Sequence, residues 1–293
     1  MARRMKKVPL SVMIPARNEE ENIAGALRSV RWADEVFVLD SNSTDRTAQI
    51  SEEHGATVVQ FNYDGGWPKK KNWGIRNLPF RNEWFLILDA DERVTPELKA
   101  AIQLAITRTD VNGFYLRWKF VFLGRWMKHS WRHGWMLRLI RRGTGEYEDL
   151  GMRGEGGWDV EVHENVIVEG ATDVLSPHLL HASLKNLSWW LKKQNEFSDW
   201  NAVRRQRQLA EGFPPRSYLF SRDPLLRRKW LKALFLRMPG KPVLMFLYLY
   251  IVMQGFRDGR QGLYFCALRA AHELNNCAKV YEATLAQKKR ARS

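Results

Sequence analysis

The chain has 293 residues, of which 45% are hydrophobic, and its formal net charge is +15. That apolar content supports a buried core and excludes an intrinsically disordered protein. The positive charge favours polyanionic partners, namely nucleic acid, an anionic bilayer or phosphorylated substrates. Two cysteines exclude a disulfide framework and do not favour a cysteine-based zinc site. The basic N-terminal segment lacks the apolar stretch of a signal peptide, so we expect a cytoplasmic protein.

The first hundred residues alternate between short apolar runs and helical patterns. The apolar runs predict four strands, at residues 10–14, 36–39, 57–61 and 84–88. Helices are expected between them, and Asn18 with Glu21 has the pattern of a capping box for the first helix. Pro96 opens a further helix. Strands that alternate with helices predict an α/β fold in which a parallel sheet is covered on both faces.

Acidic side chains follow three of the predicted strands. Glu19 comes after the first strand, Asp40 after the second, and Asp89 and Asp91 after the fourth. Ligands of parallel sheets bind at the carboxyl ends of the strands, so we expect these carboxylates at one binding edge. An Asp-x-Asp pair there suits Mg²⁺ or Mn²⁺, which take oxygen ligands from protein and substrate phosphate together.

A basic segment precedes the fourth predicted strand and contains Lys69, Lys70, Lys71 and Arg76. We expect one or two of these side chains to contact a diphosphate as charge-assisted donors. The others are expected to lie on a solvated helix face.

The remainder of the chain has two different patterns. Residues 113–181 show short strand patterns rich in aromatic residues, arginine and glycine, and we expect them to continue the first domain. The last hundred residues predict helices, of which 224–237 is strongly basic and 243–256 is almost entirely apolar. The apolar segment is shorter than the roughly 20 residues that span a bilayer. It suits a protein that lies in the membrane interface, and the alternative is a buried helix on the sheet domain.

Four N-terminal motifs occur in a specific order. They are Ile14-Pro15-Ala16-Arg17-Asn18-Glu19, Asp40-Ser41-Asn42-Ser43-Thr44-Asp45, Lys71-Asn72-Trp73-Gly74 and Asp89-Ala90-Asp91-Glu92. In this order they resemble the motifs of family 2 glycosyltransferases, which are inverting enzymes of the GT-A fold. Three later motifs are similar to the branch that adds sugars to the lipopolysaccharide inner core: Val162-His163-Glu164, His181-Ala182-Ser183 and Gly255-Phe256-Arg257-Asp258-Gly259. The resemblance covers almost the whole chain.

The resemblance implies roles for the positions that bind the donor. Pro15, Arg17 and Glu19 would line the nucleotide base and ribose. Asp40 would accept a hydrogen bond from the base, as uracil requires, and Lys71 would contact the diphosphate.

The same resemblance implies a metal site and a catalytic base. Asp89 would lie near the ribose and phosphates, while Asp91 and His181 would hold Mg²⁺ or Mn²⁺. Glu164 falls at the position of the base that removes a proton from the acceptor hydroxyl, although the family more commonly has Glu-Asp there. The alternatives for the base are Glu161 and Asp159.

Together these patterns predict a GT-A (Rossmann-like nucleotide-diphospho-sugar transferase) domain over residues 1–185. Residues 1–107 would be its nucleotide-sugar-binding half, residues 108–185 its acceptor-side half, and 186–293 a helical, membrane-associating region. The expected donor is a UDP-hexose, with UDP-glucose first. The expected acceptor is a lipid-anchored glycan, either lipopolysaccharide core or a polyprenyl-diphosphate-linked saccharide, reached from the cytoplasmic face of the inner membrane.

Three alternative functions can be compared with this prediction. A nucleic-acid-binding protein would explain the charge and the 13 tryptophans, but no RNA- or DNA-binding motif occurs. A nucleotidyltransferase of the same fold usually has a basic glycine-rich loop after the first strand, where this chain is acidic. A non-catalytic membrane scaffold has no need of the Asp-x-Asp pair or Glu164.

Overall fold

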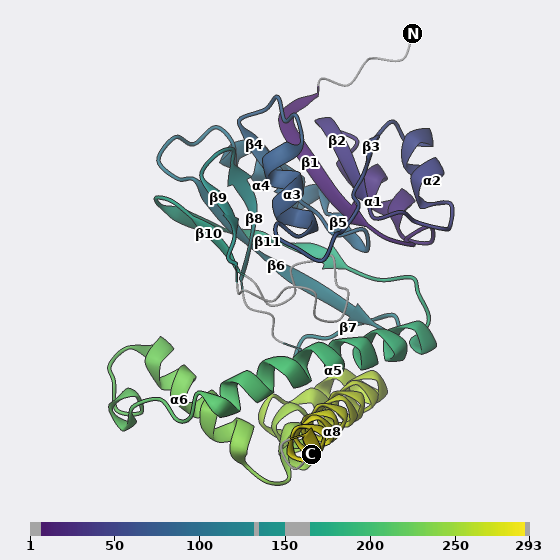
Figure 1. The fold of residues 1–293 in the computed structure, drawn as a ribbon. Helices are drawn as coiled ribbons and strands as arrows, with labels where there is room; N and C mark the ends of the chain where they lie inside the picture. Colours follow the sequence, from purple (N-terminus) through teal and green to yellow (C-terminus); the bar gives the residue numbers. More distant parts are fainter. Residues whose placement is uncertain (1–6, 132–134, 150–164, 291–293) are drawn as a thin grey trace. The chain divides into compact units, whose positions relative to one another are not determined.

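The computed structural model describes residues 7–131, 135–149 and 165–290. The chain divides into two units (Figure 1). The first comprises Met1–Trp126 and His133–Lys185, and the second comprises Met127–Arg132 and Asn186–Ser293. The strands of the central sheet lie in the first unit, and the second unit is built from helices.

The central sheet has nine strands in the order β3-β2-β1-β4-β8-β6-β11-β5, with β7 paired to β6. Its parallel part consists of β3 (Thr57–Gln60), β2 (Ala33–Asp40), β1 (Val8–Ala16) and β4 (Trp84–Ile87). The rest consists of β8 (Met136–Arg141), β6 (Gly113–Phe122), β11 (Thr172–His181), β5 (Glu92–Val94) and β7 (Arg125–Trp126). A separate antiparallel ribbon is made by β9 (Gly145–Tyr147) and β10 (Val166–Val168). The predicted α/β class with a parallel-rich sheet is confirmed.

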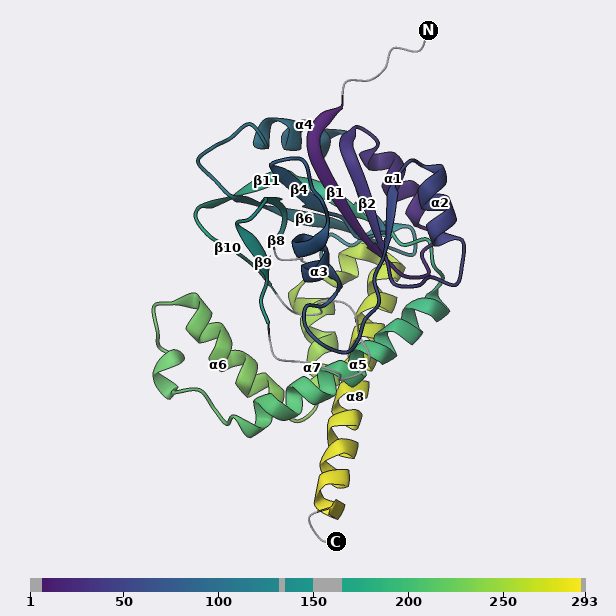
Figure 2. The same cartoon turned by 45° about the horizontal axis from the view of Figure 1, so that its top comes forward.

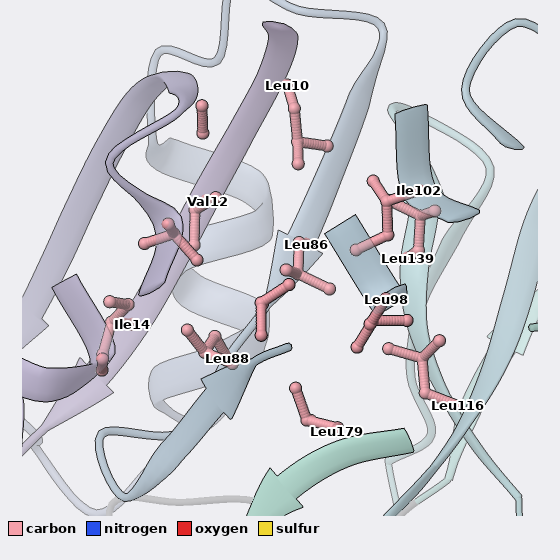
Figure 3. Close-up of a cluster of buried hydrophobic side chains, with 14 of the residues drawn as sticks. Leu10, Val12, Ile14, Leu86, Leu88, Leu98, Ile102, Leu116, Leu139 and Leu179 are labelled. Atoms are coloured by element: carbon pink, nitrogen blue, oxygen red, sulfur yellow. The ribbon is translucent and has the colours of Figure 1, made fainter. Parts of the chain in front are cut away.

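Both faces of the sheet are buried. Successive side chains of a strand point to opposite faces, and consecutive residues of β1 are buried. Val12 and Ile14 belong to one apolar cluster, whereas Met13 between them belongs to another. Helices α1 (Ile23–Val30) and α4 (Pro96–Ala105) contribute to the first cluster. Figure 3 shows Leu86 of β4 between the side chains of β1 and those of α4 in this cluster. The helix α3 (Lys70–Asn77) packs against the second cluster, to which Tyr147 of β9 also belongs. The helix α2 (Thr47–Glu53) packs against β2 and β3, and Figure 2 shows it beside β2.

The predicted capping box is wrong. Asn18 has a φ of 54°, and its side-chain oxygen accepts a hydrogen bond from the backbone N–H of Thr44 at 2.8 Å. The helix α1 instead begins at Ile23, with Asn22 in the capping position but without a side-chain cap. Asn18 therefore joins the loops after β1 and β2, and this long-range contact takes the place of the local one that the sequence pattern indicates.

The second unit is a set of helices arranged around the C-terminal helix. It contains α5 (Leu187–Ala210), η2 (Arg216–Tyr218), α6 (Pro224–Arg237), α7 (Lys241–Leu247), η3 (Tyr248–Val252), η4 (Gly255–Asp258) and α8 (Gly259–Arg290). The long helix α8 packs against α5 and α7. The predicted helical C-terminal region is confirmed. Within the apolar stretch 243–256, α7 has no buried residue, whereas Leu249 and Gly255 after it are buried. Within the described residues, no helix has both the length and the apolar content to cross a membrane.

A buried carboxylate organises the second unit. Asp258 is 1% exposed and accepts hydrogen bonds from the backbone N–H groups of Lys128, His129 and Ser130. The Ser130 hydroxyl donates a further one at 2.7 Å. Burial raises the pKa of Asp258, but the hydrogen bonds from Ser130 and His129 outweigh it and hold the pKa below its ordinary value. Asp258 thus fixes the segment that follows β7 to the start of α8.

We predict that Asp258→Ala lowers the free energy of unfolding by about 3 kcal/mol, because a charged acceptor is lost and three N–H groups, including the buried one of Ser130, lose their partner. Asp223→Ala is the matched control, since Asp223 makes a single capping bond to Leu225 N–H at the start of α6. Its expected cost is about 1 kcal/mol. Urea unfolding of both variants measures the difference, and equal costs would contradict the role of Asp258.

Candidate active site

The carboxyl ends of β1, β2 and β4 bring three loops to one edge of the sheet. Ala16 at the end of β1 pairs with Asp40 at the end of β2, and the N–H of Ser41 bonds to the Ala16 carbonyl. On the other side of β1, the N–H of Leu88 bonds to the carbonyl of Met13, so the turn with Asp89 follows directly. The parallel topology thus places the loops that carry the predicted site residues side by side.

Asp40 is buried within the turn that follows it. One carboxylate oxygen accepts hydrogen bonds from the N–H of Ser43 at 3.0 Å and from the side-chain amide of Gln60 at 3.1 Å. The other oxygen accepts from the Ser43 hydroxyl. A carboxylate has about four acceptor positions, so these contacts leave capacity for one more donor.

Glu19 forms an ion pair that joins two distant loops. Its carboxylate lies 2.7 Å from Nζ of Lys185 and accepts a hydrogen bond of 2.7 Å from the side-chain amide of Asn22. Burial raises the pKa of Glu19, and the bonds from Asn22 and Lys185 oppose that shift. Asn22 also accepts a hydrogen bond from the N–H of Leu184. Glu19 therefore holds the segment after β11 against the loop after β1, a partnership that the sequence did not indicate.

A buried ionic cluster surrounds Asp89. Its carboxylate lies 3.1 Å from Nζ of Lys71 and 2.7 Å from a guanidinium nitrogen of Arg138. The same nitrogen of Arg138 lies 3.2 Å from Glu92, and Glu92 accepts a hydrogen bond from the Asp89 N–H at 2.8 Å. Arg138 and Lys71 hold the pKa of Asp89 well below its ordinary value despite burial. Burial, opposed by Arg138 and reinforced by Asp89, raises the pKa of Glu92 to about 7.

The lysines at the start of helix α3 are buried, contrary to the expectation that most of the basic residues lie on a solvated face. Lys69 and Lys70 are 2% exposed and Lys71 is 9% exposed. Nζ of Lys70 donates to the carbonyl of Ala16 at 3.1 Å, at the end of β1. This burial could not be predicted from the sequence, because a run of lysines does not show which way the helix faces when it packs at the strand ends. Arg76 alone has the expected surface position, in an ion pair with Glu146.

Asn72 fixes the orientation of this helix. Its side-chain amide donates to the carbonyl of Tyr147 at 2.8 Å, and its oxygen accepts from the N–H of the same residue at 2.7 Å. The side chain is fully buried. The Asn72 side chain thus bonds to both backbone groups of Tyr147 in β9, and this attachment holds the neighbouring Lys71 beside Asp89.

Asp91 and His181, the predicted metal ligands, lie together. Nε2 of His181 is 3.5 Å from a carboxylate oxygen of Asp91. The pairing of β11 with β5 brings them together, because it places His181 opposite Glu92. The rings of Trp118 and Phe120 flank the imidazole, with centroids 4.7 and 5.3 Å away.

A divalent cation fits this pair as a partial ligand set. Over residues 7–131, 135–149 and 165–290, no group of three His, Cys, Asp or Glu side chains could hold a metal. Mg²⁺ is usually held in such sites by one or two carboxylates together with substrate phosphates and water. One carboxylate and one imidazole accept Mn²⁺ more readily than Mg²⁺, which prefers oxygen ligands.

The remaining predicted residues are placed differently. Pro15 is buried in β1, opposite Leu39 of β2. Arg17 is exposed at the start of the loop that contains Asn18. Glu164, the predicted base, lies outside the described residues, as do its alternatives Glu161 and Asp159.

Residues 11–156 match the family model of glycosyl transferase family 2, a span of about half the chain. The chain is similar over most of its length to the lipopolysaccharide core biosynthesis glycosyltransferase LpsC of Rhizobium meliloti (strain 1021). The two are 26% identical over 283 residues, which is 94% of this chain and 93% of LpsC. A 4,4'-diaponeurosporenoate glycosyltransferase of Staphylococcus haemolyticus (strain JCSC1435) is 45% identical over 103 residues, 32% of this chain and 28% of that protein.

Two solved structures match most of the length of this chain. One is S. aureus TarS 1–349 in complex with UDP-GlcNAc, with a TM-score of 0.44, 15% identity and coverage of 91% of this chain and 90% of that one. The other is the mannosyltransferase PcManGT from Pyrobaculum calidifontis in complex with GDP-Man and Mn²⁺, with a TM-score of 0.44, 16% identity and coverage of 94% and 87%.

The family match and the relationship to LpsC define the class of protein: the chain is a glycosyltransferase. Within that class, it belongs to glycosyltransferase family 2 through the domain that begins in β1. This decides against the nucleotidyltransferase and scaffold alternatives.

We predict that Glu92 makes the free energy of unfolding depend on pH between about 4.5 and 7. Because its folded pKa is raised to about 7 from 4.5, its contribution is fully present below pH 4.5 and is lost as pH rises through 7. Asp89 has a lowered pKa, so its contribution is lost only at more acidic pH. Glu92→Gln should therefore flatten the fall in unfolding free energy between pH 4.5 and 7. An unchanged slope in urea unfolding at several pH values would contradict the assignment.

Proposed function

We propose that this glycosyltransferase moves a hexose, with glucose as the first choice, from a UDP-sugar to a lipid-anchored glycan, with inversion at the anomeric carbon. One observation carries the proposal. The Asp91–His181 pair and the Lys71–Asp89 pair follow the carboxyl ends of the parallel strands and of β11, at the edge where such sheets bind ligands.

The charge at this edge suits a diphosphate. Lys71 and Arg138 are cations, Asp89 is held ionised, and burial keeps Glu92 protonated up to a pH of about 7. The four groups together then have a net positive charge. In the proposal, residues 1–107 bind the donor, with Pro15, Arg17 and Glu19 near the base and ribose, and Asp40 as the acceptor for a uracil N–H.

The proposed metal site consists of Asp91 and His181, with diphosphate oxygens as further ligands. A bound Mn²⁺ or Mg²⁺ would act as a Lewis acid that neutralises charge on the leaving diphosphate. Lys71 supplies a second positive charge to the same phosphates through its Nζ. Asp89 orients Lys71 through their ion pair at 3.1 Å.

The acceptor side of the proposal assigns the base to Glu164 within residues 108–185. The carboxylate removes the proton from the acceptor hydroxyl as that oxygen attacks the anomeric carbon. A single displacement needs one base and no covalent glycosyl-enzyme, which accounts for inversion.

The similarity to LpsC over 94% of this chain supports an acceptor in lipopolysaccharide core. A polyprenyl-diphosphate-linked saccharide is the other acceptor of the proposed class. Both are anchored in lipid, so we propose that the protein works at the cytoplasmic face of the inner membrane as a peripheral protein. The net charge of +15 favours attraction to such an anionic surface.

We predict that the purified protein releases UDP from one UDP-sugar in the presence of Mn²⁺, and that UDP binding measured by calorimetry requires the metal. Asp91→Asn should weaken metal-dependent UDP binding by at least about tenfold, because one of two protein ligands loses its charge. Glu53→Gln, an exposed carboxylate on α2, is the matched control and should bind as the wild type does. UDP binding that ignores Mn²⁺ in the wild type would overturn the metal site.

The base is tested separately from donor binding. Glu164→Gln should lower kcat for transfer by about 10²–10⁴-fold while leaving UDP affinity nearly unchanged, because only proton removal is lost. Glu161→Gln and Asp159→Asn are the comparison variants and should retain most of their activity. A Glu164→Gln enzyme that keeps more than about a tenth of wild-type kcat would assign the role elsewhere.

A further inference from the structure

Two consecutive helices of the second unit bury none of their residues. Neither α6 nor α7 has a buried side chain, although most of their residues are apolar. Soluble helices normally bury an apolar stripe against the rest of the protein. The side chains of α6 and α7 therefore leave much apolar surface exposed to solvent, and such a surface usually marks an interaction site.

The exposed apolar side chains form a stripe along α7 and η3. Val243, Leu247 and Ile251 recur every four residues and are 64%, 42% and 57% exposed. Tyr248 and Val252 repeat the same spacing beside them and are 50% and 67% exposed. Side chains four apart lie on the same side of a helix, so these five residues share one face, which we call the apolar stripe.

The opposite side of this segment anchors it to the protein. Leu249 is only 8% exposed, and α7 packs against α8. The apolar stripe therefore faces away from the helix that supports it.

The charged residues along this part of the chain are all of one sign. Between Asp223 and Asp258 the sequence contains no acidic residue. The basic residues of this interval are Arg227, Arg228, Lys229, Lys232, Arg237, Lys241 and Arg257. The first four of them are exposed on α6. Their aliphatic stems can lie along an apolar surface while the charged ends reach phosphate groups.

We infer that the apolar stripe and the exposed cations of α6 form a docking surface for an anionic lipid bilayer. Val243, Leu247, Tyr248, Ile251 and Val252 enter the boundary between headgroups and acyl chains, and the cations of α6 bind lipid phosphates. The segment from α7 through η3 has the length of an interfacial anchor, since at about 1.5 Å per residue it is much shorter than a hydrocarbon core of about 30 Å.

Charge distinguishes this occupant from the alternatives. A second copy of the chain would bring the same cations face to face, and the interval between Asp223 and Asp258 has no carboxylate to pair them, so repulsion opposes self-association through this surface. Nucleic acid would satisfy the cations but would not bury the aliphatic side chains of the apolar stripe. An anionic bilayer satisfies both parts.

The inference rests on the proposed function in one respect: an enzyme with a lipid-anchored acceptor must reach a membrane. The docking itself is measured without acceptor or donor. UDP release from a soluble UDP-sugar reports the catalytic site independently of the bilayer, so failure of one can be told from failure of the other.

The test is co-sedimentation of the full chain with phosphatidylcholine vesicles, with and without phosphatidylglycerol, at physiological salt. The wild type should bind the vesicles that contain phosphatidylglycerol. Ile251→Asp should lower that partitioning by about tenfold, because a charge replaces an apolar side chain that would enter the bilayer. Arg228→Glu/Lys232→Glu should lower it by at least about 25-fold, because each lost cation costs about fivefold and the new carboxylates are repelled by the lipid phosphates.

The matched controls make the same types of substitution at exposed positions outside the docking surface. Leu104→Asp alters an aliphatic residue that is 74% exposed on α4, and Lys288→Glu/Lys289→Glu reverses two exposed charges near the end of α8. Both should bind the vesicles as the wild type does. Every variant should keep the wild-type melting temperature and rate of UDP release, and Val243→Asp replaces Ile251→Asp if the latter unfolds.

Three results would overturn the inference. The first is a wild type that does not bind anionic vesicles while still releasing UDP. The second is a loss of binding in the controls as large as that in the variants of the docking surface. The third is a dimer in solution that Ile251→Asp converts to a monomer, which would assign the apolar stripe to a second copy of the chain.

Discussion

The ionic cluster of Lys71, Asp89, Arg138 and Glu92 is the constraint on which the candidate site depends. Arg138 is 5% exposed and Glu92 is fully buried, so water satisfies neither the guanidinium nor the carboxyl group. Each must find its partners within the protein, because leaving a buried ion or a buried polar group unpaired is destabilising. The cluster connects α3, the turn after β4, β5 and β8, and thereby fixes the loop that carries Asp91. Removal of one member therefore affects all four segments.

Much of the site could be predicted because it follows from backbone topology. Asp40, Asp89 and Asp91 come at the ends of apolar runs, and parallel strands bring such ends to one edge. Their approximate position therefore needs only the order of strands and helices. His181 required the family resemblance, since nothing local in its sequence shows that β11 pairs with β5 beside Asp91.

Other parts could not be predicted, since they depend on contacts between residues distant in sequence. Arg138 reaches Asp89 because the antiparallel strand β8 inserts beside β4. The three residues of β5 are too few for a recognisable strand pattern. A run of lysines usually lies on a solvated helix face, so the sequence predicts exposure for the lysines at the start of α3. They are buried because this part of α3 packs against the strand ends. Asn18 matched a capping pattern but bonds instead to Thr44 in the neighbouring loop.

The pairing of β11 with β5 also governs when the site forms. Asp91 and His181 are ninety residues apart in sequence, and β11 is the last strand of the sheet. Contacts of such long sequence separation form late and slowly, because loop closure must precede them. During synthesis, the parallel strands β1 to β4 can pair before β11 has left the ribosome. The nascent chain thus acquires a sheet edge well before Asp91 and His181 can lie beside each other, and that pair forms only when the first unit is almost complete.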